Sequence, residues 1–239
     1  MTSNQWSDRE FGALPSVVVA AHELKAPLTL VRQLSLLMAD GSLSETDSKR
    51  ISQQTAQVAE RALALVSDLA HTANLSPTLF PLEPVNPLAV CQEIAQQMRP
   101  TMELYGQQIE WPRTKVRRDQ LVVANQTLLG RVLANFLENA LRYSEPSAKV
   151  RVQLQKHGAM LRLGVRDFGP MMSLREYRRL TDEMEKRKSI RTRPESSGLG
   201  IYVASQFAQA MDGEIGLIRH RDGLTFYVEL PLSRQLSWL

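Results

Sequence analysis

A histidine and a carboxylate are neighbours near the start of the chain, and a proline follows one helical turn after the carboxylate. The three residues are His22, Glu23 and Pro27. An imidazole can accept a phosphoryl group on one ring nitrogen while an adjacent carboxylate takes the N–H of the other. Pro27 cannot donate to the Glu23 carbonyl, so we expect the helix to kink or loosen there and leave room for a second protein. A single histidine is more often an ordinary solvated or packed side chain, so this pattern needs support from the rest of the chain.

Two asparagines lie four residues apart on a segment of strong helical periodicity. Asn135 and Asn139 share a helix face with Arg142, and Tyr143 is next in the chain. Asparagine is a poor residue for a helix interior, so two on one face need an explanation. An amide oxygen suits Mg²⁺, while Arg142 could pair with phosphate oxygens and Tyr143 could lie against a base or ribose. The alternative is a solvated helix face that binds nothing.

Two glycine-containing segments follow. Asp167 ends an apolar segment of alternating pattern, and Gly169 comes two residues later. A carboxylate there can accept a hydrogen bond from an exocyclic amine such as that of adenine. Gly198, Leu199 and Gly200 open a predicted helix, where small residues let a phosphate approach the backbone N–H groups. Asp-Phe-Gly is not the protein-kinase motif here, because the Lys and His-Arg-Asp partners of that motif are missing.

The order of these segments is more specific than any one of them. Residues 135–143, then 167–170, then 198–200 resemble the N-box and the two glycine boxes of the GHKL ATPase superfamily. Residues 22–29 resemble the phosphoacceptor box of two-component sensor histidine kinases. Together the resemblance covers about residues 15–232.

The resemblance implies a role for each residue of the pattern. His22 would be the phosphoacceptor and Glu23 its base. Asn139 would bind Mg²⁺ with Asn135 assisting, and Asp167 would accept a hydrogen bond from the adenine amine. The other residues expected to contact ATP are Arg142, Tyr143, Gly169, Gly198, Leu199 and Gly200. The implied cofactors are ATP and Mg²⁺.

The chain departs from the family pattern at several positions. Met171 replaces the second glycine of the first box, Ser196 replaces the leading glycine of the second, and Asn125 stands where the family often has Asp. Four residues after His22 the family commonly has Thr or Asn, which can position a water molecule for dephosphorylation; Ala26 cannot, so we expect a poor phosphatase. The lid segment is charged and could either cover the triphosphate or remain a solvated loop. Its basic residues are Lys186, Arg187, Lys188, Arg191 and Arg193.

A helical hairpin is expected to carry the histidine. Apolar residues recur at steps of four and three, with Gly41 as a helix stop and Ser44 and Asp47 resembling a capping box. The two apolar seams are Val17, Ala21, Leu24, Leu28, Val31 and Met38, then Ile51, Thr55, Val58, Ala62, Leu65 and Leu69. One hairpin buries little apolar surface, so we expect two copies to form a dimeric four-helix bundle. The alternative is packing within one chain only.

The second half mixes helical and strand patterns, which predicts an α+β sandwich with helices on one face of a mixed sheet. The expected helices are 88–105, 126–143 and 201–211. The expected strands are 120–124, 150–154, 161–165, 214–218 and 225–230.

Four prolines mark a boundary between the two halves, at Pro77, Pro81, Pro84 and Pro87. We therefore expect four parts. They are a flexible lead-in at 1–14, a dimerisation and phosphotransfer hairpin at 15–74, a linker at 75–87 and a catalytic ATP-binding domain at 88–239.

The composition limits the classes of protein to which the chain can belong. The 239 residues are 43% hydrophobic and 23% charged, and the net charge of +4 is interleaved, which does not indicate nucleic-acid binding. One cysteine, Cys91, excludes an internal disulfide and fits a reducing cytosol. No apolar run reaches the length of a membrane span. Only about twenty residues precede His22, so the sensor input is either a separate protein or part of a longer chain.

The sequence therefore predicts a cytoplasmic, homodimeric histidine kinase core. It would phosphorylate His22 from Mg-ATP and pass the phosphoryl group to an aspartate on the receiver domain of a response regulator. The alternative is a degenerate kinase that acts as a dimeric signalling scaffold with little or no ATP turnover. An anti-sigma-type serine kinase is disfavoured by the His22 hairpin.

Overall fold

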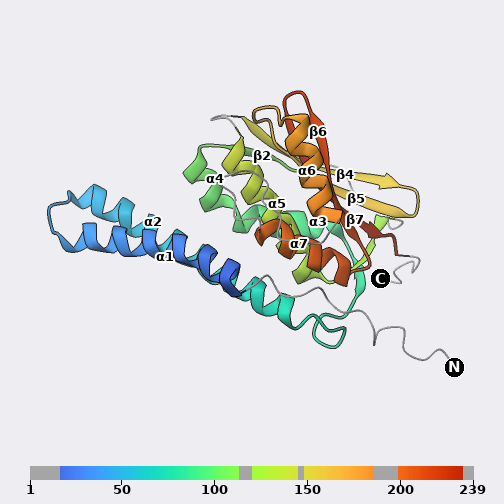
Figure 1. The fold of residues 1–239 in the computed structure, drawn as a ribbon, viewed down its shortest axis with the longest axis horizontal. Coiled ribbons are helices and arrows are strands. Elements are labelled where there is room, and N and C mark those ends of the chain that lie inside the picture. Colours follow the sequence, from blue (N-terminus) through green and yellow to red (C-terminus); the bar gives the residue numbers. More distant parts are fainter. Residues whose placement is uncertain (1–16, 113–119, 145–147, 186–198, 234–239) are drawn as a thin grey trace. The chain divides into compact units, whose positions relative to one another are not determined.

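The computed structural model describes residues 17–112, 120–144, 148–185 and 199–233, without the side chains of a few helical residues, His22 and Glu23 among them. Contacts between Cα atoms divide the chain into two compact units, Met1–Asn74 and Leu75–Leu239. Figure 1 shows the first as a helical hairpin and the second as helices layered on a sheet. Each unit is considered by itself.

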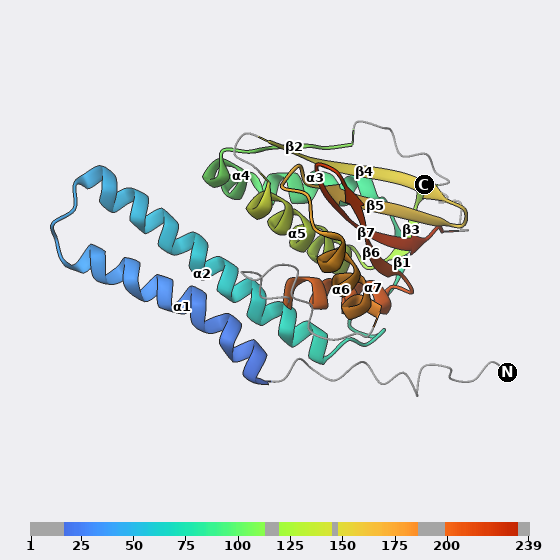
Figure 2. The same cartoon turned by 45° about the horizontal axis from the view of Figure 1, so that its top comes forward.

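The first unit is an antiparallel hairpin of α1 (Val17–Ala39) and α2 (Glu45–Ala73). Pro27 lies inside α1, and the helix continues through it to Ala39 without interruption (Figure 2). Ser44 caps α2: its hydroxyl oxygen accepts from the Asp47 backbone N–H at 3.1 Å and donates to the Asp47 carboxylate at 2.7 Å. The predicted cap is therefore present, although the carboxylate bonds the Ser44 hydroxyl and not its backbone N–H.

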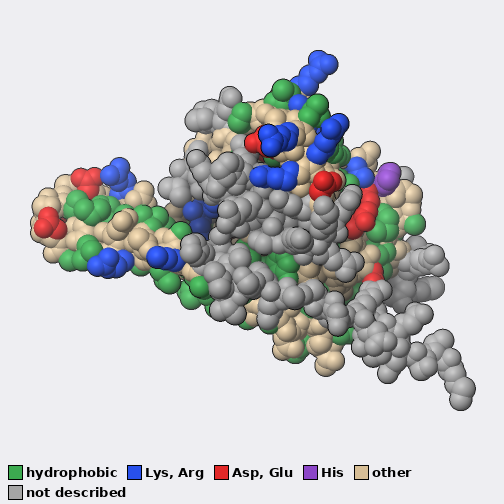
Figure 3. Space-filling model, viewed as in Figure 1, with side chains coloured by type: hydrophobic (Ala, Val, Ile, Leu, Met, Phe, Trp, Pro, Cys, Tyr) green, Lys and Arg blue, Asp and Glu red, His purple; other side chains and the backbone are tan. Residues whose placement is uncertain are grey.

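The hairpin leaves a second apolar face uncovered within one chain. Ile51 and Ala62 of α2 are buried as the seam predicts, but Leu28 and Met38, which the pattern placed in the seam, are exposed. Figure 3 shows hydrophobic side chains at the surface of the hairpin. The most exposed are Leu28, Leu36, Leu37, Leu63 and Val66, at 57, 57, 52, 68 and 46%. Such a face is typical of a helix pair that packs against another body.

The second unit is built on a five-stranded mixed sheet of order β2-β4-β5-β7-β6. β2 is parallel to β4, and all other neighbours are antiparallel. The strands are β2 (Gln108–Glu110), β4 (Lys149–His157), β5 (Met160–Arg166), β6 (Glu214–His220) and β7 (Gly223–Pro231). A separate pair joins β1 (Glu83–Val85) to β3 (Val122–Ala124). The predicted α+β class with a mixed sheet is confirmed.

Helices α5 (Gln126–Tyr143) and α7 (Leu199–Ala210) pack against each other and against the sheet (Figure 2). Nine residues of α5 are buried, and its Phe136 ring stacks on Phe226 of β7 at a centroid distance of 5.7 Å. Each fully buried leucine contributes about 2 kcal/mol through removal of apolar area from water. The α5 leucines alone thus fix this helix firmly on the sheet.

Some elements differ from those expected from sequence. The predicted helix over 88–105 is two helices, α3 (Pro87–Gln97) and α4 (Arg99–Tyr105), because Pro100 begins a new turn after Met98. α6 (Leu174–Glu185) and β2 were not predicted. Residues 83–85, assigned from sequence to the linker, form β1. The helix over 126–143 has the predicted bounds. Within the residues that the structure describes, no helix combines the length and apolar character that crossing a membrane requires.

Candidate functional site

The side chain of Asp167 is buried at the end of β5 and is held by the backbone. Only 4% of the residue is exposed. Its Oδ1 atom accepts from the N–H of Leu224 at 2.9 Å and from the N–H of Gly169 at 3.3 Å, while its own N–H donates to the Leu224 carbonyl at 2.9 Å. These bonds fix the orientation of the carboxylate, as an acceptor for a ligand amine requires.

Gly223 closes the wall behind this carboxylate. Its φ is +129°, and an added Cβ would collide with the Asp167 carbonyl oxygen and lie 2.6 Å from Asp167 Oδ1. Only glycine fits at this position, because the β6–β7 turn must press directly against Asp167.

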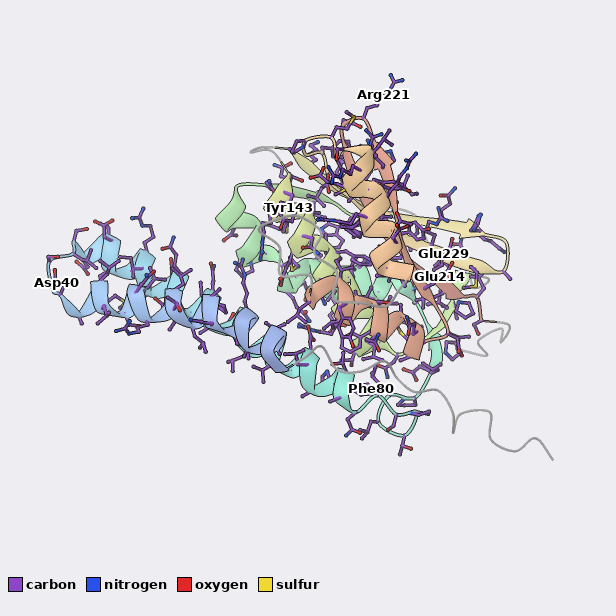
Figure 4. All side chains as sticks on the ribbon, in the orientation of Figure 1. Asp40, Phe80, Tyr143, Glu214, Arg221 and Glu229 are labelled. Atoms are coloured by element: carbon purple, nitrogen blue, oxygen red, sulfur yellow. The ribbon has the colours of Figure 1, made fainter. Side chains whose placement is uncertain are left out.

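Gly169 brings the loop after β5 against the last turn of α5. An added Cβ would collide with the Tyr143 carbonyl oxygen and lie 3.3 Å from the Tyr143 carbonyl carbon. Figure 4 labels Tyr143 at this end of α5. The structure therefore brings together Asp167, Gly169 and Tyr143, which are up to 26 positions apart in the sequence.

The two asparagines of α5 differ in their hydrogen bonds. The Asn135 side-chain amide donates to the Arg131 carbonyl at 2.9 Å, and its oxygen faces Gly200, where an added Cβ would lie 2.8 Å away. Asn139 is half-buried, and its amide makes no hydrogen bond within the part of the chain that the structure describes. Arg142 is exposed. The predicted helix face is therefore real, but its members have different surroundings.

α7 begins at Leu199, with Gly200 as its second residue. The first N–H groups of a helix have no partner within the helix and attract phosphate. Gly200 lies over α5, so this helix start faces the asparagine side of α5. Gly198, the basic lid residues and Ser196 lie outside the described residues.

Mg²⁺ usually binds to one or two protein oxygens and completes its octahedron with phosphate oxygens and water. The amide oxygen of Asn139 is therefore a protein ligand of the type that Mg²⁺ requires. The donor set of this unit is a fixed carboxylate, an amide oxygen and a helix start, and it fits a nucleotide with its metal ion.

A cation–π cluster that sequence analysis missed flanks Asp167. The Phe168 ring lies under two guanidinium groups, Arg166 at 4.7 Å and Arg151 at 5.5 Å. Arg151 and Arg166 are register partners on β4 and β5, and Arg166 pairs with Asp222 at 2.7 Å. The aromatic residue between Asp167 and Gly169 was the available signal, but the cross-strand register needed to interpret it was not predictable.

The β6–β7 turn also carries a histidine close to this cluster. His220 Nε2 lies 2.8 Å from Thr225 Oγ1. Burial, and then the charge of Arg166, lower the pKa of His220 below its ordinary value. The lowered pKa favours the neutral ring beside the charged Arg166.

His22 and Glu23 belong to α1, and their side chains lie outside the described part of the chain. Along the helix, His22 lies one turn before Ala26, and Glu23 lies one turn before Pro27.

Comparison with known proteins agrees with this geometry. Residues 124–234 match the family model of the histidine kinase-, DNA gyrase B- and HSP90-like ATPases. Sensor histidine kinase WalK of Bacillus subtilis (strain 168) is 27% identical over 205 residues, which are 83% of this chain and 33% of WalK.

Two solved structures share the fold. Full-length ShkA in complex with AMPPNP has a TM-score of 0.61 at 21% identity and covers 94% of this chain and 48% of ShkA. Histidine kinase ThkA in complex with response regulator protein TrrA has a TM-score of 0.64 at 16% identity and covers 91% of this chain and 61% of that one. This chain thus spans a third to three fifths of the length of these relatives.

Residues 124–234 of the second unit are therefore similar to a GHKL-type ATPase domain, and the chain as a whole is similar to sensor histidine kinases. The resemblance inferred from the sequence motifs is confirmed.

Proposed function

We propose that this chain is an ATP-dependent histidine autokinase that phosphorylates His22 and passes the phosphoryl group to an aspartate of a response regulator. The observation that carries the proposal is the buried Asp167 carboxylate, fixed by backbone N–H groups, in a unit where the start of α7 faces Asn135 of α5 and in a chain whose hairpin carries His22 next to Glu23. A nucleotide complex of ShkA and a response-regulator complex of ThkA support it.

The residues have the following parts in the reaction. Asp167 accepts from the adenine amine, and the start of α7, with Gly198, Leu199 and Gly200, receives the phosphates. Gly169 and Tyr143 form the adjoining wall, and Arg142 pairs with phosphate. Asn139 holds Mg²⁺, which neutralises phosphate charge when bound.

His22 attacks through its unprotonated ring nitrogen. A bond forms from that nitrogen to the γ-phosphorus, and the bond from the γ-phosphorus to the bridging oxygen breaks, which releases ADP. Glu23 takes the hydrogen bond of the other ring N–H and so keeps the attacking nitrogen free of its proton.

The chain organisation proposed for this function follows the sequence-based parts: a lead-in at 1–14, a dimerisation and phosphotransfer hairpin at 15–74, a linker at 75–87 and a catalytic domain at 88–239. The exposed apolar face of the hairpin favours a homodimer. We place the reaction in the cytoplasm, where ATP is available, with sensory input from a separate protein or a further domain.

The test is incubation with γ-labelled ATP. The label should be acid-labile and base-stable, as phosphohistidine is. His22→Gln should abolish it while ATP binding and the oligomeric state remain. The matched control is His71→Gln, in the last turn of α2, which should keep the label.

Label that persists on His22→Gln contradicts the assignment. If the unaltered chain fails to bind ATP in calorimetry, the scaffold alternative replaces the kinase.

A further inference from the structure

Phe168 is the middle residue of a turn that holds the Asp167 carboxylate. The Gly169 N–H donates to Asp167 Oδ1, two residues earlier in the chain, at 3.3 Å. This is the hydrogen bond of an Asx turn, in which the side chain of the first residue accepts from the backbone of the third. The backbone conformation of Phe168 therefore decides whether the Gly169 N–H reaches the carboxylate.

The Phe168 side chain is held by two arginines of the sheet. The Cζ atoms of Arg166 and Arg151 lie over its ring, 4.7 and 5.5 Å from the ring centroid. The two arginines are register partners on β5 and β4, so their side chains share one face of the sheet. Arg166 is partly exposed, while Val165 and Asp167 on either side of it are buried. The ring is thus fixed by groups other than those that bond the Asp167 carboxylate.

The placing of the two arginines has a cost. Like charges directly opposite each other on neighbouring strands repel. Arg151 Nε donates to Glu110 Oε2 at 2.7 Å, and Arg166 Nη2 lies 2.7 Å from Asp222 Oδ1. The Glu110 and Asp222 side chains are 36 and 65% exposed, so these ion pairs contribute little. The Arg166 side chain is only 18% exposed, and its contact with the Phe168 ring is better shielded from water, where a cation–π contact is stronger.

We propose that Phe168 is a positioning residue, whose ring, held by Arg151 and Arg166, fixes the turn that orients the Asp167 carboxylate toward a nucleotide base. This rests on the proposed function, in which that base is the adenine of ATP. Phe168 acts through Asp167 and not through contact with the nucleotide, so its effect is on the selectivity for the exocyclic amine.

The experiment compares the affinities of the full chain for ATP and for inosine triphosphate in calorimetry. Inosine triphosphate carries a carbonyl oxygen where ATP has its exocyclic amine, so the ratio of the two affinities reports the hydrogen bond to Asp167. Phe168→Leu keeps an apolar side chain without the ring face, and it should lower this ratio about fivefold or more. Phe168→Tyr keeps the ring and should keep the ratio.

Arg151 tests the same contact from the neighbouring strand. Arg151→Gln should lower the ratio, whereas Arg151→Lys, which keeps a cation, should retain most of it. Adding Arg151→Gln to Phe168→Leu should lower the ratio no further, because the contact is already lost. The matched control is Tyr227→Leu, which removes another cation–π pair of the sheet, with Arg162 Cζ 4.0 Å from the Tyr227 ring centroid. Its ratio should equal that of the unaltered protein.

Hydrogen exchange of the ligand-free protein tests the turn independently of the function. The Gly169 amide should exchange about fivefold faster or more in Phe168→Leu, and at an unchanged rate in Tyr227→Leu. An unchanged Gly169 rate in Phe168→Leu, or an equal loss of affinity for the two nucleotides, overturns the proposal. Faster exchange in a chain whose unaltered form binds neither nucleotide supports the positioning of the turn and rejects only the kinase.

Discussion

The Oδ1 atom of Asp167 accepts a hydrogen bond of 2.9 Å from the backbone N–H of Leu224, which ties the end of β5 to the start of β7. The same oxygen accepts from Gly169 at 3.3 Å. Both donors are main-chain N–H groups, so the orientation of the carboxylate does not depend on a hydrogen bond from a neighbouring side chain. Because the carboxylate is held in place in this way, we expect a substitution of Asp167 to change ligand binding and to keep the fold.

Asp167→Asn should reduce ATP affinity while the fold is kept. The amide oxygen can still accept from Leu224, but the negative charge that strengthens a bond to the adenine amine is gone. Hydrogen bonds to charged groups contribute about 1.5–3 kcal/mol, so the affinity should fall by about tenfold to a hundredfold. GTP lacks that exocyclic amine, so the ratio of ATP to GTP affinity in calorimetry should fall as well.

Asp222→Asn is the control for that substitution. Asp222 is largely exposed and pairs with Arg166 at 2.7 Å, so its loss should leave the ATP to GTP ratio unchanged. An unchanged ratio in Asp167→Asn would show that this carboxylate does not contact the base.

Gly223→Ala should destabilise the second unit strongly. The position has φ +129°, and the new Cβ would collide with the Asp167 backbone, so we expect a loss of about 2 kcal/mol or more in the free energy of unfolding. Gly158→Ala is the comparison, because Gly158 has φ +63° and open space around it, and the cost should be about 1 kcal/mol from backbone strain alone. Equal losses in chemical denaturation would argue against the close approach of Gly223 to Asp167.

Leu63→Glu should dissociate the proposed homodimer. Leu63 is 68% exposed on α2 within one chain, so a charge there costs the monomer little but would be buried between two hairpins. Light scattering should fall from twice 26.9 kDa toward 26.9 kDa. Leu79→Glu, at a residue of the second unit that is 56% exposed, should leave the mass unchanged. A monomer in the unaltered protein at micromolar concentration would contradict the dimer.

Because of Cys91, the free energy of unfolding should fall as the pH rises in the alkaline range. The residue is 1% exposed, and burial raises the pKa of its thiol to about 12. The folded state therefore retains a proton that the unfolded state loses. The contribution of the protonated thiol to the free energy of unfolding is fully present below pH 9 and is lost as the pH rises toward 12. Cys91→Ala should flatten the fall in unfolding free energy over that range relative to the unaltered protein. Identical alkaline slopes for the two proteins would show that the thiol does not contribute.

Ala26→Thr should accelerate dephosphorylation of a response regulator that accepts label from this chain. Position 26 is exposed on α1 and one helical turn after His22, so a hydroxyl there could orient the attacking water. The assay follows the phosphorylated regulator with ADP present, and Ala26→Val, which has a similar shape without the hydroxyl, is the control. Strong acceleration by the unaltered chain would contradict the argument that a side chain is missing.

Local sequence predicted the elements that carry the site. The 3.6-residue period of residues 126–143 predicted the bounds of α5, because its apolar side chains recur on one face of a helix. Ser44 and Asp47 predicted the start of α2, since a cap needs only residues three apart. The strands expected over 214–218 and 225–230 likewise correspond to β6 and β7, which pair as an antiparallel hairpin.

Elements that depend on distant partners were not predictable in the same way. β1 and β2 are three residues each, too short to carry a period, and exist because β3 and β4 offer them hydrogen bonds. The split between α3 and α4 depends on where the chain can turn at Pro100. Arg151 and Arg166 meet over Phe168 only because β4 and β5 pair in one register.

The sequence by itself determined which chemical groups the chain possesses, in what order, and, for strongly periodic segments such as residues 126–143, on which helix they lie. Residue type and spacing suffice for that, because periodicity and turn chemistry are local. Only the tertiary structure decided that Gly200 meets Asn135, that Gly223 presses on Asp167, and that Gly169 abuts Tyr143. These contacts join residues 26 to 65 positions apart, and they arise from packing of whole helices and strands, which no local pattern encodes.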